Sequence, residues 1–140
     1  LKNSLIIWWD GVPNGHVNGQ IANEQGYLQS VLTTAGHENF IWCRNGQAQV
    51  DNTQQADTDA FRLWISQKYG SSHVYDPNQI YIDNAIKDPL NPNYSADQSR
   101  LALQRVPYSL MLIDEAHLVT NIRRTIARDL QKHIFNLASV

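Results

Sequence analysis

The segment LMLIDEAHLVTNIRRTIARDLQKHIFNL, residues 110–137, decides the fold class of this chain. From residue 116 onward its apolar residues recur every three or four positions, which places them on one stripe of a helix with a period of about 3.6 residues. A long amphipathic C-terminal helix is therefore predicted, and the rest of the chain must cover its apolar stripe. The stripe consists of Val119, Ile122, Ile126, Leu130, Ile134 and Leu137.

The start of this segment, residues 110–113, has two interpretations. A strand would complete an alternation of strands and helices, which is typical of an α/β domain with a largely parallel sheet. A helix would keep the phase of the later stripe, and Pro107 would then begin one helix of about 45 Å at 1.5 Å per residue. We favour the strand, because that helix is longer than a small domain is wide and because Asp114 suits a helix N-cap. A dimer would reverse this preference.

Length and composition indicate one globular domain spanning residues 1–140. Hydrophobic residues make up 42% of the chain, and 13 acidic against 11 basic residues give a net charge of −2. This balance argues against a nucleic-acid partner. The single cysteine, Cys43, excludes an internal disulfide. Because no apolar run reaches the ~18 residues that span a bilayer, we expect a soluble, cytoplasmic protein without membrane contact.

Two strand–helix pairs are expected before residue 70. Apolar, β-branched and aromatic residues predict buried strands, and helical spacing followed by a glycine predicts helices that end at that glycine. After the second strand, Asn45-Gly46 is a turn signal for a hairpin with residues 47–50. The expected elements are a strand over residues 4–9, a helix over 21–35 ending at Gly36, a strand over 40–43, and a helix from Asn52 or Thr53 to Gly70.

Between these elements and the C-terminal segment, residues 73–75 and 80–82 flank Asp76-Pro77-Asn78-Gln79. This tetrapeptide suits a type I turn, so a small hairpin is predicted here, with a helix from Ser95 to Val106 after it. The fold class expected is α/β, with about four short strands alternating with helices. The alternative is α+β, with β-hairpins and one helix continuous from Pro107.

Three apolar runs of the chain end in an aspartate, namely Asp10, Asp83 and Asp114. If the runs are parallel strands of one sheet, their carboxyl ends meet where open α/β folds bind ligands. Clustered carboxylates there would hold Mg²⁺, and Glu115 or His117 would handle a proton as the catalytic group. The alternative assigns Asp10 to a turn, Asp83 to a loop and Asp114 to a helix cap.

Residues 110–117 resemble the Walker B stretch of DEAH-type helicases and related ATPases, in which hydrophobic residues precede an acidic pair that serves magnesium and water. The resemblance covers only these eight residues. A P-loop requires a lysine after glycine to hold the phosphates, and none of Lys2, Lys68, Lys87 or Lys132 follows a glycine. The sequence therefore predicts no autonomous ATPase. The glycine-containing stretch 11–19 matches no dinucleotide fingerprint, and a surface loop explains it.

Aromatic and basic residues supply candidate contact surfaces. Trp8 and Trp9 are adjacent, so in a strand they point to opposite faces, and an exposed one would line a ligand pocket or a subunit contact. Arg124 and Arg128 form a basic stripe on the last helix, which suits either phosphate contacts or a solvated face. Two functions result: a metal-assisted phosphoester or nucleotide hydrolase, and a non-catalytic assembly module that is homodimeric through the C-terminal helix.

Overall fold

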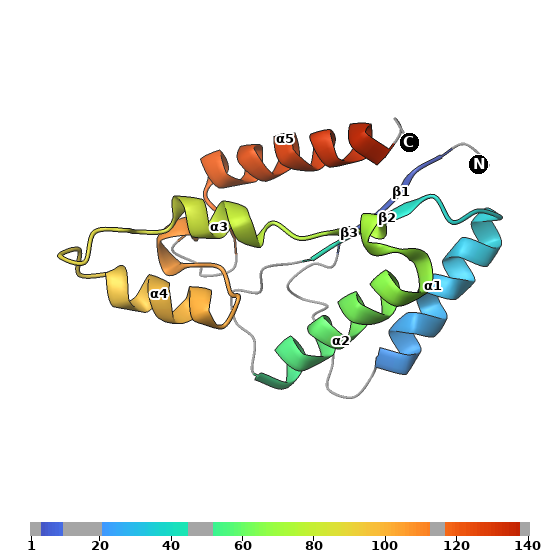
Figure 1. Cartoon of the computed structure of the whole chain (residues 1–140), viewed down its shortest axis with the longest axis horizontal. Coiled ribbons are helices and arrows are strands. Elements are labelled where there is room, and N and C mark those ends of the chain that lie inside the picture. Colours follow the sequence, from blue (N-terminus) through green and yellow to red (C-terminus); the bar gives the residue numbers. More distant parts are fainter. Residues whose placement is uncertain (1–3, 10–20, 45–51, 113–116, 138–140) are drawn as a thin grey trace. The chain divides into compact units, whose positions relative to one another are not determined.

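The computed structural model describes residues 4–9, 21–44, 52–112 and 117–137. The chain forms two compact units, the first made of residues 1–44 and 50–75, and the second of residues 45–49 and 76–140. Figure 1 shows the elements of both, and each unit is described by itself below. The prediction of a single domain over residues 1–140 stays a prediction.

The first unit is a three-stranded parallel sheet with a helix after each of the first two strands. The strands lie in the order β1-β2-β3, and the register places Ile6 opposite Phe40 and Trp42 opposite Val74. The sequence predicted β2 and both helices within a residue or two of their bounds. The elements are β1 (Ile6–Trp9), α1 (Ile21–Ala35), β2 (Phe40–Cys43), α2 (Asn52–Tyr69), the 3₁₀ helix η2 (Ser71–His73) and β3 (Val74–Tyr75).

Both helices of the first unit end at glycines, as the sequence predicts. Gly36 follows α1 with φ 71°, and Gly70 follows α2 with φ 105°. A side chain at either position would be strained in this left-handed region, which explains why glycine stands there. The Gly36 N–H donates to the carbonyl oxygen of Leu32 at 2.9 Å, and the Gly70 N–H donates to that of Ser66 at 3.1 Å. These bonds close the last turns of the two helices.

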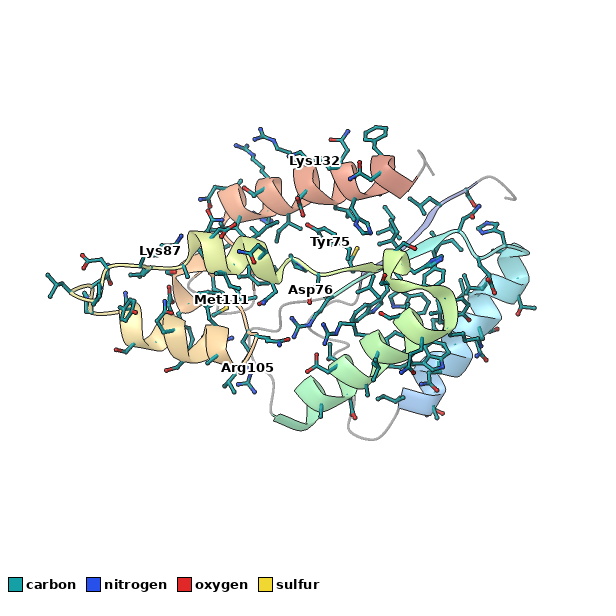
Figure 2. The ribbon with its side chains drawn as sticks, viewed as in Figure 1. Tyr75, Asp76, Lys87, Arg105, Met111 and Lys132 are labelled. Atoms are coloured by element: carbon teal, nitrogen blue, oxygen red, sulfur yellow. The ribbon has the colours of Figure 1, made fainter. Side chains whose placement is uncertain are left out.

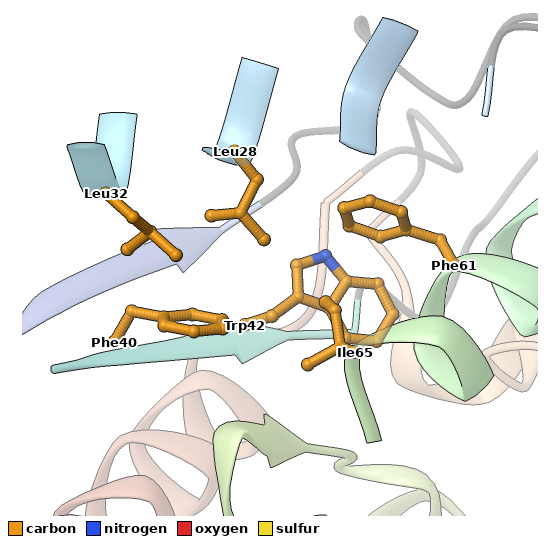
Figure 3. Packing of buried hydrophobic residues seen from close by; sticks show 6 residues of the cluster. All are labelled: Leu28, Leu32, Phe40, Trp42, Phe61 and Ile65. Atoms are coloured by element: carbon orange, nitrogen blue, oxygen red, sulfur yellow. The ribbon is translucent and has the colours of Figure 1, made fainter. Parts of the chain in front are cut away.

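The core of the first unit lies on one face of the sheet (Figure 3). Phe40 and Trp42 project from β2 toward both helices, and their exposed fractions are 1% and 0%. The buried side chains that meet them are Leu28 and Leu32 from α1 and Phe61 and Ile65 from α2. Both helices therefore cover the same face, as right-handed crossovers between adjacent parallel strands require. The expected burial of the strand over residues 4–9 is wrong at two positions, because Leu5, just before β1, and Ile7, within it, are 40% and 47% exposed.

The predicted hairpin over residues 73–82 is wrong. Val74 and Tyr75 form β3, which is parallel to β2, whereas residues 80–82 belong to the helix α3 (Asn78–Asn84). The Asp76 carboxylate accepts a hydrogen bond from the Asn78 N–H at 3.0 Å, so the tetrapeptide that suits a turn starts a helix instead. Tyr81 and Ala85 are both buried and lie four residues apart, so helical backbone places them on the same side. Their burial favours the helix over the hairpin.

The second unit contains α3, α4 (Tyr94–Ala102), the 3₁₀ helix η3 (Tyr108–Leu110) and α5 (Thr120–Leu137). The prediction of a helix from Ser95 to Val106 is correct in kind but too long, because α4 ends at Ala102. α5 confirms the predicted amphipathic C-terminal helix and packs against α3. Its stripe is inside, with Ile122, Ile126 and Leu130 exposed by only 1%, 2% and 9%.

Residues 110–112 match neither of the two interpretations of this segment. Leu110 ends η3, and Met111 forms an isolated antiparallel bridge with Leu118. The Leu112 N–H donates to the His117 carbonyl oxygen at 2.7 Å, so residues 112 and 117 are hydrogen-bonded to each other. α5 begins only at Thr120, so Asp114 does not cap it and a helix continuous from Pro107 is wrong. The described residues contain three strands, not the expected four.

A buried carboxylate organises the loops of the second unit. Asp97 is 0% exposed and accepts hydrogen bonds from the Ile86 N–H and the Ser109 N–H, each at 3.1 Å, and from the Ser109 hydroxyl. Nearby, Arg100 donates through Nε to the Val106 carbonyl oxygen. Ile86 lies 11 positions before Asp97 and Ser109 lies 12 positions after it. The bonds to Asp97 therefore connect α4 to the segment that precedes it and to the segment that follows it.

Among the described helices, none combines the length and the apolar character that crossing a membrane requires.

Candidate anion-binding site

The carboxyl ends of the three parallel strands are followed directly by charged residues. β1 ends at Trp9 and precedes Asp10, β2 ends at Cys43 and precedes Arg44, and β3 ends at Tyr75 and precedes Asp76. Open parallel sheets bind ligands outside the carboxyl ends of their strands. Asp76 begins the second unit, where its carboxylate accepts the N–H of Asn78 at the start of α3. The candidate site of the first unit therefore centres on Arg44.

The backbone of Arg44 is held by the sheet. Its N–H donates to the Tyr75 carbonyl oxygen at 2.8 Å, which extends the pairing of β2 and β3 by one residue. The side chain is 1% exposed, although arginine is among the residues that are rarely buried without a partner. A guanidinium is thus fixed at the end of the central strand.

An aspartate of α2 lies between Arg44 and a second arginine. Asp59 Oδ1 is 3.8 Å from Arg44 Nη2 and 3.7 Å from Arg62 Nη2. Asp59 and Arg62 are three residues apart, so the helix presents them on neighbouring positions of one face. The side chains of Asp59 and Arg62 are 37% and 39% exposed, which leaves this side of the group open to solvent.

The arrangement suits an oxyanion as a ligand. Guanidinium groups bind phosphate and carboxylate through planar, paired N–H donors, and such charge-assisted bonds are about twice as strong as neutral ones. The buried Arg44 supplies a donor in surroundings of low dielectric constant, where an ionic contact is stronger than in water. An anion would meet Arg62 on this exposed side, and it would contact Arg44, whose side chain is 1% exposed, only by displacing the Asp59 carboxylate.

Of the three predicted metal ligands, the structure describes only Asp83, so their convergence stays a prediction. Asp83 lies on α3 and not at the end of a strand, is exposed, and accepts a hydrogen bond from Gln79 Nε2 at 2.9 Å. Asp10, Asp114 and Glu115 lie outside the described residues. His117 is exposed in the short segment before α5. The residues that the structure describes contain no group of three His, Cys, Asp or Glu side chains that could hold a metal ion.

The predicted contact residues have different surroundings. Trp8 is half-buried against the core of the first unit, and its ring lies edge-on to Tyr27 with a centroid distance of 5.3 Å. This packing accounts for a tryptophan at position 8, so no ligand or second subunit is needed to explain it. The side chain of Trp9 lies outside the described part of the structure. Arg124 and Arg128 are exposed on α5.

A serine and a histidine of the first unit are in contact but do not form a nucleophile–base pair. Ser4 Oγ lies 3.2 Å from His37 Nε2, and the Asn39 N–H donates to His37 Nδ1 at 3.2 Å. Because Nδ1 accepts this bond, the proton of the neutral imidazole is on Nε2, which then donates to Ser4. A general base needs its accepting nitrogen toward the serine hydroxyl, so this pair is structural.

The sequence does not point to Arg44, Asp59 and Arg62 as a group, because the pattern that stands out in it is the aspartate after each of three apolar runs. A charged residue directly after the buried strand FIWC was the available signal for Arg44. Searches with this chain against protein families, curated proteins and solved structures returned no significant match.

Proposed function

We propose that the first unit binds a small phosphate-bearing molecule, such as a nucleotide or another phosphoester, at the carboxyl ends of its strands. The observation that carries this proposal is the guanidinium of Arg44, which is buried at the end of the central strand and shares Asp59 with Arg62. The β-α-β-α-β order of the unit supports it, because mononucleotide-binding halves of doubly wound folds have this order. The element order supports the proposal by analogy between folds.

The reaction that we propose for this ligand is metal-assisted hydrolysis of its phosphoester. Mg²⁺ is usually bound by one or two carboxylates together with the phosphates of the substrate, so it does not need a cage made entirely of protein groups. Asp10 follows β1 directly in the sequence and is the carboxylate that we assign to this ion. The ion would neutralise charge on the phosphate, while Arg44 and Arg62 would orient it.

Arg62→Ala tests the anion site, because Arg62 is partly exposed and its loss need not disturb the core. We expect AMP to bind this variant about 10- to 100-fold more weakly than the original chain, since a hydrogen bond to a charged group contributes about 1.5–3 kcal/mol. Isothermal titration calorimetry with AMP and with inorganic phosphate measures the change.

Arg123→Ala is the matched control for this experiment, because it removes one exposed arginine from the second unit. Equal affinities of the Arg62→Ala variant and the original chain would contradict the assignment. Absence of AMP and phosphate binding, with a dimer mass in solution, would favour the assembly module instead. On α5, the exposed apolar side chain of Phe135, at 62%, is available to that alternative.

Asp10→Asn tests the magnesium ligand. In the original chain with AMP, saturating Mg²⁺ should raise the melting temperature, because a ligand at about 100 times its Kd stabilises the folded state by about 2.7 kcal/mol. We expect Asp10→Asn to lose most of this increase and Asp83→Asn to retain it, since Asp83 lies on an exposed turn of α3. Differential scanning fluorimetry with and without EDTA gives both values. Equal responses of the two variants would exclude Asp10 as the ligand.

A further inference from the structure

The outward face of α5 carries three cations and one aromatic ring in a line, which we call the basic ridge: Arg124, Arg128, Lys132 and Phe135. All four side chains are exposed, and Phe135 is 62% exposed. Arg124, Arg128 and Lys132 are four residues apart, so each step rises about 6 Å along the helix and turns about 40° around it. Viewed down the helix axis, Phe135 lies between the directions of Arg124 and Arg128. Figure 2 labels Lys132 on this helix.

The ridge cannot turn inward, because the opposite face of α5 is fixed in the second unit. Ile122, Ile126 and Leu130 are buried on that face. The sequence of α5 contains four Arg and Lys residues but only one acid, Asp129, which lies three residues before Lys132 and therefore beside that end of the ridge. The ridge is therefore a positively charged surface on a chain whose net charge is −2.

We propose that the basic ridge binds single-stranded nucleic acid, with its cations on successive phosphates and Phe135 stacked on a base. Charge complementarity favours a polyanion, and arginine forks match phosphate geometry. The exposed ring favours a single strand over a duplex, because unstacked bases bind on aromatic side chains beside basic residues. The net charge of the chain limits the affinity, so binding depends on this local surface and not on the charge of the protein as a whole.

An anionic membrane is the competing partner for a basic helix, but the packing of α5 does not favour it. A helix that lies in a membrane surface inserts its apolar face between the lipids. The apolar stripe of α5 is buried in the protein, and Phe135 is the one large apolar side chain on the ridge. A single ring gives little insertion, whereas it is sufficient to stack on one base.

The test is fluorescence anisotropy of a labelled oligonucleotide of about 12 nucleotides, a length within the ~4–16 nucleotides that small single-strand sites cover. For three phosphate contacts, the logarithm of the association constant should fall with the logarithm of salt concentration with a slope of about −2. Arg124→Ala/Arg128→Ala should reduce the slope to about −0.7 and weaken binding at least about tenfold. Phe135→Ala should weaken binding about fivefold or more with the slope unchanged.

The control variant Lys68→Ala/Lys87→Ala removes the same charge from two other exposed positions. This control should bind the oligonucleotide as tightly as the original chain does. Arg62→Ala should also leave the affinity unchanged, which would show that the oligonucleotide binds the ridge and not the anion site of the first unit. Equal losses in the control and in Arg124→Ala/Arg128→Ala would overturn the proposal, as would unchanged binding in the latter variant. Preference for anionic phospholipid vesicles over the oligonucleotide, measured by co-sedimentation, would overturn it in favour of a membrane partner.

Discussion

Trp42→Ala is expected to lower the free energy of unfolding of the first unit by about 3–5 kcal/mol, the usual cost of removing a buried large aromatic side chain. Trp42 is 0% exposed on the central strand and lies between the two helices that cover the sheet (Figure 3). Its ring meets Phe61 edge-on at a centroid distance of 5.7 Å, so the substitution also removes an aromatic pair. The cavity would face both α1 and α2, which limits how far the core can collapse into it.

Urea unfolding followed by circular dichroism measures this loss. Leu63→Ala on α2 is the control, because Leu63 is 56% exposed and surface substitutions usually change stability by less than about 0.5 kcal/mol. A Trp42→Ala variant as stable as the Leu63→Ala variant would show that the sheet and its helices do not pack as described.

Asp97→Ala is expected to destabilise the second unit by about 3 kcal/mol or more, because each buried donor left unsatisfied costs about 1–3 kcal/mol. The Ile86 N–H and both donors of Ser109 would lose their acceptor. Asp97→Asn preserves the shape but should also destabilise. Asp97 Oδ1 and Oδ2 each accept a backbone N–H, so in either orientation the asparagine NH₂ would face one of these donors.

Amide hydrogen exchange distinguishes this role from a general loss of stability. The amides of Ile86 and Ser109 should lose protection in Asp97→Asn, while amides of β2 in the first unit keep theirs. Asp83→Asn is the control, because Asp83 is exposed and accepts a hydrogen bond from Gln79 within α3. Unchanged protection at residues 86 and 109 would contradict the central role of Asp97.

Three elements of the first unit could be predicted from the sequence, because short-range patterns in the chain determine them. α1, β2 and α2 follow from apolar spacing and from the glycines that end the helices at positive φ. The short run at residues 80–82 was ambiguous, since three apolar residues fit one turn of a helix as well as a strand. Tertiary packing decided it, because Tyr81 and Ala85 are buried together.

Long-range partners explain what the sequence could not predict. Asp97 is recognisable as a buried acceptor only when Ile86 and Ser109 are known to meet it. Arg44 becomes a site residue only through its contact with Asp59 on α2. Charged residues are usually placed at the surface by sequence analysis, so burial of either group was not predictable from its neighbours in the chain.

We propose that an anion binds beside Arg44 and Arg62, and the most direct measurement observes these two side chains. A ¹H–¹⁵N spectrum of the arginine Nε–Hε groups, assigned with Arg44→Lys and Arg62→Lys, is recorded during titration with AMP. We predict saturable shifts of the Arg44 and Arg62 signals, with smaller changes for Arg124 and Arg128 on α5. Shifts confined to the α5 arginines, or none at Arg44 and Arg62, would contradict the claim.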